Sequence, residues 1–116
     1  MVLLRRWLRA KIHFVRLTGK DLNYKGSITI GEELLKASGI EENEMVHVVN
    51  VENGNRFETY VIKGNGKVVE LNGAAARLGE VGDKLIIMAE TLAEKKVPCR
   101  VVVCGEENEV VRIENN

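Results

Sequence analysis

Short runs of alternating apolar and polar residues make up most of the chain. Alternation with a period of two is typical of strands that bury one face. The runs that predict strands are 11–18, 27–30, 45–51, 57–62, 67–71, 84–89, 100–104 and 110–113. Two other segments, 32–38 and 73–78, predict short helices. The sequence therefore predicts a mainly β fold with two short helices.

Turn residues between these runs predict two hairpins. Asn53-Gly54 separates the runs 45–51 and 57–62, and Asn-Gly between two strands is a strong hairpin signal. The segment 105–108 separates the last two runs in the same way, and Pro98 marks the approach to that hairpin.

A weak internal repeat suggests how the strands combine. Each copy reads strand, short helix, glycine, a turn ending in an acidic residue, and strand; the copies cover 27–48 and 69–87. Two such units can interlock into a closed barrel, which leaves no exposed sheet edges. We expect residues 1–116 to form one domain, a small six-stranded barrel with two short helices.

Composition narrows the class of protein. The 116 residues are 45% apolar and 29% charged, as in globular proteins. Zero net charge and 4% aromatic residues disfavour nucleic-acid binding. No apolar run approaches the ~20 residues of a membrane span, and the first residues lack a signal-peptide pattern. We therefore expect a soluble cytoplasmic protein with no membrane partner.

The distribution of charges and the two cysteines give less information about function than the overall composition does. Six basic residues precede the first acidic residue, Asp21, and the tail is acidic. We interpret these as solvated ends, from which one or two cations could meet an anionic ligand. Cys99 and Cys104 lack the additional ligands of a zinc site, so no metal is expected and both are predicted to be buried thiols.

Gly26-Ser27 is the first candidate for chemistry. Glycine allows backbone conformations that other residues avoid. A strained serine that follows it can turn its hydroxyl onto the glycine carbonyl carbon, which gives an ester by an N-to-O acyl shift. Elimination of the ester leaves dehydroalanine, which hydrolyses to a pyruvoyl group and ammonia. The same dipeptide is also common in ordinary turns.

Two further segments carry polar groups in useful positions. Asn72 can cap the helix at 73–78, whose first amides would then suit a carboxylate, although an ordinary capped helix fits as well. Alternation places Arg56, Glu58 and Tyr60 on one strand face. Arg56 could bind a carboxylate there and Tyr60 could relay a proton, although an exposed cross-strand trio is equally compatible.

The two histidines give weaker signals. Lys11 and His13 share one face of the first predicted strand, and a half-buried imidazole is the default interpretation for His13. His47 is predicted to be an ordinary strand residue without a particular partner.

Several separated blocks, in order and closely spaced, together resemble the pyruvoyl-dependent aspartate 1-decarboxylases. The resemblance covers nearly the whole chain. The blocks are Leu8-Arg9-Ala10-Lys11-Ile12-His13, Asp21-Leu22-Asn23-Tyr24-Lys25-Gly26-Ser27-Ile28-Thr29-Ile30, Asn43-Glu44, Asn53-Gly54-Asn55-Arg56-Phe57-Glu58-Thr59-Tyr60, Leu71-Asn72-Gly73-Ala74-Ala75-Ala76 and Val81-Gly82-Asp83.

The resemblance implies a double-psi β-barrel and a homotetramer with active sites between subunits. It implies self-cleavage between Gly26 and Ser27 into a β chain, 1–26, and an α chain, 27–116. Ser27 would become the pyruvoyl group, which serves without PLP or metal. That group would form a Schiff base with L-aspartate, and loss of the α-carboxylate would give β-alanine for pantothenate biosynthesis.

The resemblance also implies roles for individual residues. Tyr60 would be the proton donor, and Thr59 would assist self-cleavage and lie near the substrate. The remaining residues fall into two groups: Gly73, Ala74, Ala75, Arg56 and Lys11 would bind substrate, and His13, Tyr24 and Asn72 would line the pocket.

Two other functions stay open at this point. An unprocessed barrel of the same fold could serve as a binding or scaffold protein. A DNA-binding barrel would need a basic face, which the zero net charge disfavours.

Overall fold

A computed structural model describes all 116 residues as nine strands, one α-helix and one 3₁₀ helix. The elements are β1 (Arg5–Arg16), β2 (Gly19–Asp21), β3 (Ser27–Gly31), α1 (Glu32–Ser38), β4 (Met45–Asn50), β5 (Arg56–Gly64), β6 (Val69–Asn72), η1 (Gly73–Leu78), β7 (Lys84–Ala93), β8 (Arg100–Cys104) and β9 (Val110–Asn115). The mainly β prediction is confirmed.

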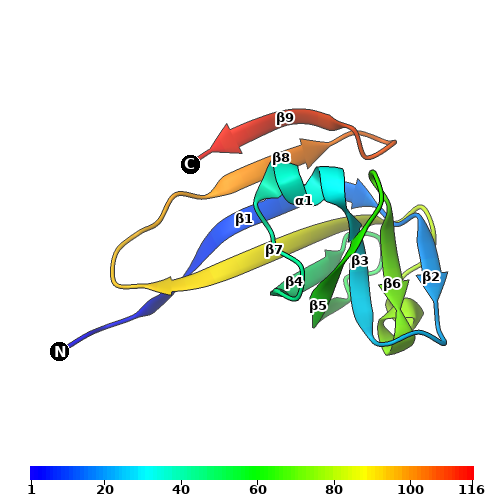
Figure 1. The fold of residues 1–116 in the computed structure, drawn as a ribbon, viewed down its shortest axis with the longest axis horizontal. Helices are drawn as coiled ribbons and strands as arrows, with labels where there is room; N and C mark the ends of the chain where they lie inside the picture. Colours follow the sequence, from blue (N-terminus) through cyan, green and yellow to red (C-terminus); the bar gives the residue numbers. More distant parts are fainter.

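The strands close into a barrel because β1 and β2, which follow each other in the chain, pair with opposite ends of the series β6-β3-β5-β4-β7. The sheet order is β2-β6-β3-β5-β4-β7-β1-β8-β9. β2 follows β1 after two residues, so β1 closes the ring against β7 while β2 closes it against β6 (Figure 1). We count β1 and β2 as one bent strand and leave the β8–β9 hairpin out of the ring. The ring then has six strands, as predicted, and is a double-psi β-barrel.

The internal repeat appears as a pseudo-twofold arrangement of this ring. β3-α1-β4 corresponds to β6-η1-β7, and like strands pair antiparallel, β3 with β6 and β4 with β7. β3 pairs parallel with β5, just as β6 pairs parallel with β2. The two units therefore interlock as the repeat predicts.

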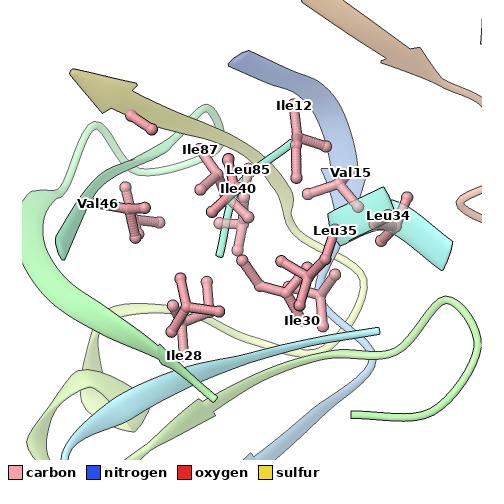
Figure 2. Close-up of a cluster of buried hydrophobic side chains, with 14 of the residues drawn as sticks. Ile12, Val15, Ile28, Ile30, Leu34, Leu35, Ile40, Val46, Leu85 and Ile87 are labelled. Carbon is pink, nitrogen blue, oxygen red and sulfur yellow. The ribbon is translucent and has the colours of Figure 1, made fainter. Parts of the chain in front are cut away.

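Alternation places one side of every barrel strand in a common core. Ile12, Ile28, Leu71 and Ile87 have no exposed surface, and α1 adds Leu34. Figure 2 shows isoleucine, leucine and valine side chains from strands and helix converging on this interior. Each fully buried side chain of this kind contributes about 1.5–3 kcal/mol. The core fixes which strand faces point outward, and the outward faces carry the candidate site.

The structure corrects the predicted limits of several elements. β1 begins at Arg5 and β7 ends at Ala93, because the two strands continue as a paired ribbon beyond the barrel (Figure 1). The three-residue strand β2 was not predicted, since it has no alternating pattern of its own. No helix of the structure has both the length and the apolar character needed to cross a membrane.

The predictions for the cysteines are half right. Cys104 is buried in β8, and burial raises the pKa of its thiol to about 11. Cys99 is only partly buried and precedes β8, where its backbone pairs with Asn116.

A buried asparagine attaches the β8–β9 hairpin to the barrel. Asn108 is 1% exposed and lies in the turn of the hairpin. Its Oδ1 accepts a hydrogen bond from the Arg16 amide at 2.7 Å, and its Nδ2 donates to the carbonyls of Arg16 and Lys67, each at 3.0 Å. Asn108 has φ +60°, a left-handed conformation that asparagine tolerates well. One side chain thus joins the hairpin to the end of β1 and to the loop before β6.

Candidate active site

Ser27 is the first residue of β3 and lies at the centre of the candidate site. Ile28 pairs with Val61 of β5 and with Leu71 of β6, and all three side chains point into the core. Because neighbouring residues of a strand point to opposite sides, Ser27 and its partner Asn72 face outward. Both are nevertheless buried, at 0% and 3% exposure.

Two hydrogen bonds hold the Ser27 hydroxyl. The hydroxyl donates to the carbonyl oxygen of Lys25 at 2.8 Å. It accepts from Nδ2 of Asn72 at 2.9 Å, and the same Nδ2 donates to Oγ1 of Thr29 at 2.9 Å. Asn72 therefore does not cap η1, and the prediction of a capped helix there is wrong. Its amide faces the serine because strand pairing places the two residues opposite each other.

Gly73 packs directly against Gly26, the residue before Ser27. A Cβ at Gly73 would lie 2.7 Å from Cα and 2.8 Å from N of Gly26, and 3.0 Å from the carbonyl oxygen of Tyr24. Gly73 also has φ +63°, which strains any residue with a side chain. Only glycine permits this approach, and it presses the start of η1 against the segment before Ser27. No atom lies within 4 Å of the Cβ that Gly26 would carry.

Tyr60 lies beside Ser27 on the outer face. Since Ile28 pairs with Val61 in the parallel pair β3–β5, the same register continued by one residue places Ser27 opposite Tyr60. Strands in this relation are roughly 4.8 Å apart. Thr59 is one residue earlier, so its side chain points to the other side of β5, and it makes no side-chain hydrogen bond to Ser27. Of the two, only Tyr60 shares the outer face with the serine.

An open pocket of about 350 Å³ adjoins the serine through Asn72. Tyr24 and Asn72, both predicted to line a pocket, lie on its wall together with a basic and two acidic side chains. The lining residues are Lys20, Asp21, Tyr24, Thr29, Ile62, Glu70 and Asn72. η1 begins next to this region, with Gly73 and Ala75 buried and Ala74 exposed.

The predicted cations lie away from Ser27 within one chain. Cross-strand pairing puts His13, Ile86, Val49 and Arg56 in one row across β1, β7, β4 and β5. Arg56 is four residues from Tyr60, roughly 13 Å along the strand. Lys11 lies on β1, three strand spacings from β5, which is roughly 14 Å. Lys11, His13 and Arg56 therefore share the outer face of the sheet but do not contact position 27.

His13 has an unusual environment on that face. Its Nδ1 is buried without a hydrogen-bond partner, and its ring stacks on Phe14 with centroids 3.8 Å apart. Burial, and next the positive charge of Lys11, lower the pKa of His13. The ring is therefore biased toward its neutral form.

Three of the six basic residues that precede Asp21 form ion pairs with residues remote in the sequence. Arg6 pairs with Glu90 at 2.7 Å, Arg9 with Glu44, and Lys20 with Glu80 at 3.2 Å. Lys11 and Arg56 make no ion pair, so both remain available for an anion.

His47 does have partners, contrary to the prediction. Its Nε2 lies 2.9 Å from Oε1 of Glu90 and 3.4 Å from Oε2 of Glu58. Both carboxylates come from neighbouring strands, so no local sequence signal could identify them. The hydrogen bond from Arg6 and that from His47 oppose the effect of burial and lower the pKa of Glu90.

Sequence reasoning did not select Thr29, which shares the Asn72 amide with Ser27. The signal was present, because alternation in 27–30 places Thr29 on the same side as Ser27.

Comparison with known proteins adds an independent finding. The family described as aspartate decarboxylase matches residues 3–111 of the chain. An aspartate 1-decarboxylase of Thermotoga sp. (strain RQ2) is 53% identical over 108 residues, which cover 91% of this chain and 95% of that protein. One from Caldicellulosiruptor bescii is 54% identical, covering 91% and 88%, and one from Haloquadratum walsbyi is 46% identical, covering 92% and 96%.

Proposed function

The chain belongs to the aspartate decarboxylase family, and we propose that it converts L-aspartate to β-alanine and CO₂ with a pyruvoyl group made from its own Ser27. The observation that carries the proposal is that two hydrogen bonds fix the position of the Ser27 hydroxyl. It is buried directly after Gly26, between the Lys25 carbonyl and the Asn72 amide. The β-alanine would supply pantothenate biosynthesis, and the site of action would be the cytoplasm.

The precursor would cleave itself at the Gly26-Ser27 bond. Oγ of Ser27 attacks the carbonyl carbon of Gly26, the C–N bond breaks, and the freed nitrogen takes the proton, which leaves an ester. Loss of the Cα proton and cleavage of the Cβ–O bond release the Gly26 carboxylate and leave dehydroalanine at position 27. One water molecule then converts this residue to the pyruvoyl group and ammonia. Thr59 is proposed to assist on the family resemblance alone, because its side chain points to the other side of β5 from Ser27.

The surroundings of position 27 fit such a group. Asn72 Nδ2 offers a hydrogen bond toward it, and Gly73 brings the start of η1 close without a side chain in the way. When present, the group supplies a ketone conjugated to an amide carbonyl, which accepts the electron pair left by departing CO₂. Tyr60, next to position 27, is the proposed donor of the proton to the substrate Cα.

Recognition of the two carboxylates of aspartate requires cations, and the two predicted for this role, Lys11 and Arg56, do not reach position 27 within one chain. Lys11 and Arg56 lie on the outer sheet face without ion-pair partners, and we propose that a neighbouring subunit presents them, with His13, to the site. Ala74 and Ala75 would hold the substrate through the backbone of η1, and Tyr24 and Asn72 would line the pocket. A homotetramer would provide such interfaces, since closed symmetric assemblies are the usual solution.

Intact-mass measurement combined with an assay of CO₂ release from aspartate tests the proposal. We expect fragments 1–26 and 27–116, the second without a free α-amine, together with CO₂ and β-alanine. Ser27→Ala should remain intact and inactive. A Ser27→Ala protein that still formed β-alanine would overturn the assignment. A wild-type protein that stayed intact and inactive would favour the alternative, an unprocessed barrel with a binding or scaffold role.

A further inference from the structure

We propose that Thr29 is a positioning residue for self-cleavage, which holds the Asn72 amide so that it donates to the Ser27 hydroxyl. This inference rests on the proposed function, since it concerns the same bond. The one hydrogen bond of the Thr29 hydroxyl is that from Asn72, so Thr29 would act only through Asn72.

The hydrogen-bond pattern fixes the orientation of the amide. The single proton of the Ser27 hydroxyl is directed to the Lys25 carbonyl, so Oγ must accept its other hydrogen bond. The atom of Asn72 facing Ser27 is therefore the nitrogen, which carries two hydrogens. One goes to Ser27 Oγ and the other to Thr29 Oγ1, each at 2.9 Å. Both donors of a 3%-exposed side chain are thus used by two hydroxyls of one strand face.

Packing fixes the Thr29 side chain in turn. A Cβ at Gly64 of β5 would lie 2.6 Å from Cγ2 of Thr29, so the methyl group occupies the space that this glycine leaves open. A β-branched side chain has few χ1 choices on a strand. With the methyl over Gly64, Oγ1 is directed to Asn72.

The chemical consequence concerns the first step of cleavage. As the Ser27 hydroxyl loses its proton, negative charge builds on Oγ before it passes to the carbonyl oxygen of Gly26 on attack, and an oriented N–H stabilises the charge on Oγ. Without Thr29, one amide hydrogen of Asn72 would have no acceptor in a buried site. The amide would then turn to find one, which would weaken its hold on Ser27.

The test compares Thr29→Val, which replaces the hydroxyl by a methyl group of similar size, with Thr29→Ser, which keeps the hydroxyl. Thr91→Val makes the same chemical change on β7, at a threonine without a side-chain hydrogen bond. Cleavage of the full chain is followed by intact mass from the moment of cell-free synthesis. We expect Thr29→Val to cleave roughly three- to tenfold more slowly than wild type, as for loss of one oriented hydrogen bond. Thr29→Ser keeps the hydroxyl but lacks the methyl group that directs it, so it should slow cleavage less than Thr29→Val does. Thr91→Val should stay near the wild-type rate.

A double-variant comparison separates positioning from a general structural effect. In an Asn72→Ala background, Thr29→Val should cause no further slowing, because its effect passes through the amide. If the circular dichroism spectrum of Thr29→Val shows that its β-sheet is lost, the cleavage rate of Thr29→Ala is measured in its place and compared with the same thresholds. Slowing of less than threefold, or equal slowing without Asn72, would overturn the inference. A wild type that never cleaves would instead refute the proposed function.

Discussion

Replacing Gly73 by alanine should disturb both the stability of the fold and the bond that is cleaved. Alanine at φ +63° costs about 1–2 kcal/mol in the left-handed region. Its Cβ would lie 2.7 Å from Cα of Gly26, whereas carbon atoms in contact prefer about 3.5–4.0 Å. The three nearest atoms all belong to the backbone, so the segment that carries the Gly26-Ser27 bond must move by roughly 1 Å to restore ordinary carbon contacts. Overpacking of this kind adds about 1–3 kcal/mol.

Gly54→Ala provides a matched control. Gly54 has φ +77°, but its Cβ would meet nothing within 4 Å. Gly54→Ala should therefore lose only the about 1–2 kcal/mol of backbone strain. The difference between the two variants isolates the contact with Gly26.

The two properties are measured on separate backgrounds. Stability is measured by urea unfolding of the uncleavable Ser27→Ala chain, at fixed protein concentration because subunit association would shift the midpoint. Cleavage is measured by intact mass on the chain with Ser27. We expect Gly73→Ala to unfold with about 2–5 kcal/mol less stability than its parent and to cleave at least tenfold more slowly. The reasoning fails if Gly73→Ala cleaves at the wild-type rate and loses no more stability than Gly54→Ala.

Three other substitutions probe other parts of the structure. Tyr60→Phe should cleave normally but release CO₂ from aspartate at least tenfold more slowly, because the proposed proton donor is lost; equal turnover would remove Tyr60 from that role. Asn108→Ala should lower the free energy of unfolding in urea by about 2–4 kcal/mol, because three hydrogen bonds of a buried side chain are lost; a loss below 1 kcal/mol would show that the hairpin is held otherwise. A hydrogen bond from Asn50 and one from a backbone amide lower the pKa of Asp83. Because the folded pKa lies below the ordinary value of 3.8, the contribution of Asp83 is complete above that pH and is lost as the pH falls through the folded pKa. Asp83→Asn should therefore flatten the fall in stability on acidification below about pH 4, and an unchanged slope in urea titrations at several pH values would contradict this.

Much of the fold could be predicted because strand formation leaves a local signal. The run 100–104 matches β8 fully, and 32–38 matches α1. The limits of β1 and β7 were missed, since both strands extend beyond the core as a ribbon, where no buried face enforces alternation. The strand β2 has only three residues and forms because β6 lies beside it.

The candidate site was predicted by residue type more than by arrangement. Gly26 and Ser27 were identified together because their chemistry requires adjacent residues. The role of Asn72 was misread, since its position before a helix favours a cap, whereas strand pairing turns its amide to Ser27. Whether Tyr60, Lys11 and Arg56 act as proposed stays a prediction.

By itself, the sequence determined the alternation of inward and outward side chains, the duplicated strand-helix-strand unit and the glycine-serine bond. These features depend on neighbours along the chain, whose geometry is set by backbone sterics and a period of two. Only the tertiary structure decided that Ser27, Thr29 and Asn72 share one hydrogen-bond network while β5, β4 and β7 lie between the strand of Ser27 and that of Lys11. Strand order and register depend on the packing of the whole core. Distances between residues remote in sequence therefore cannot be predicted from the pattern of any one segment.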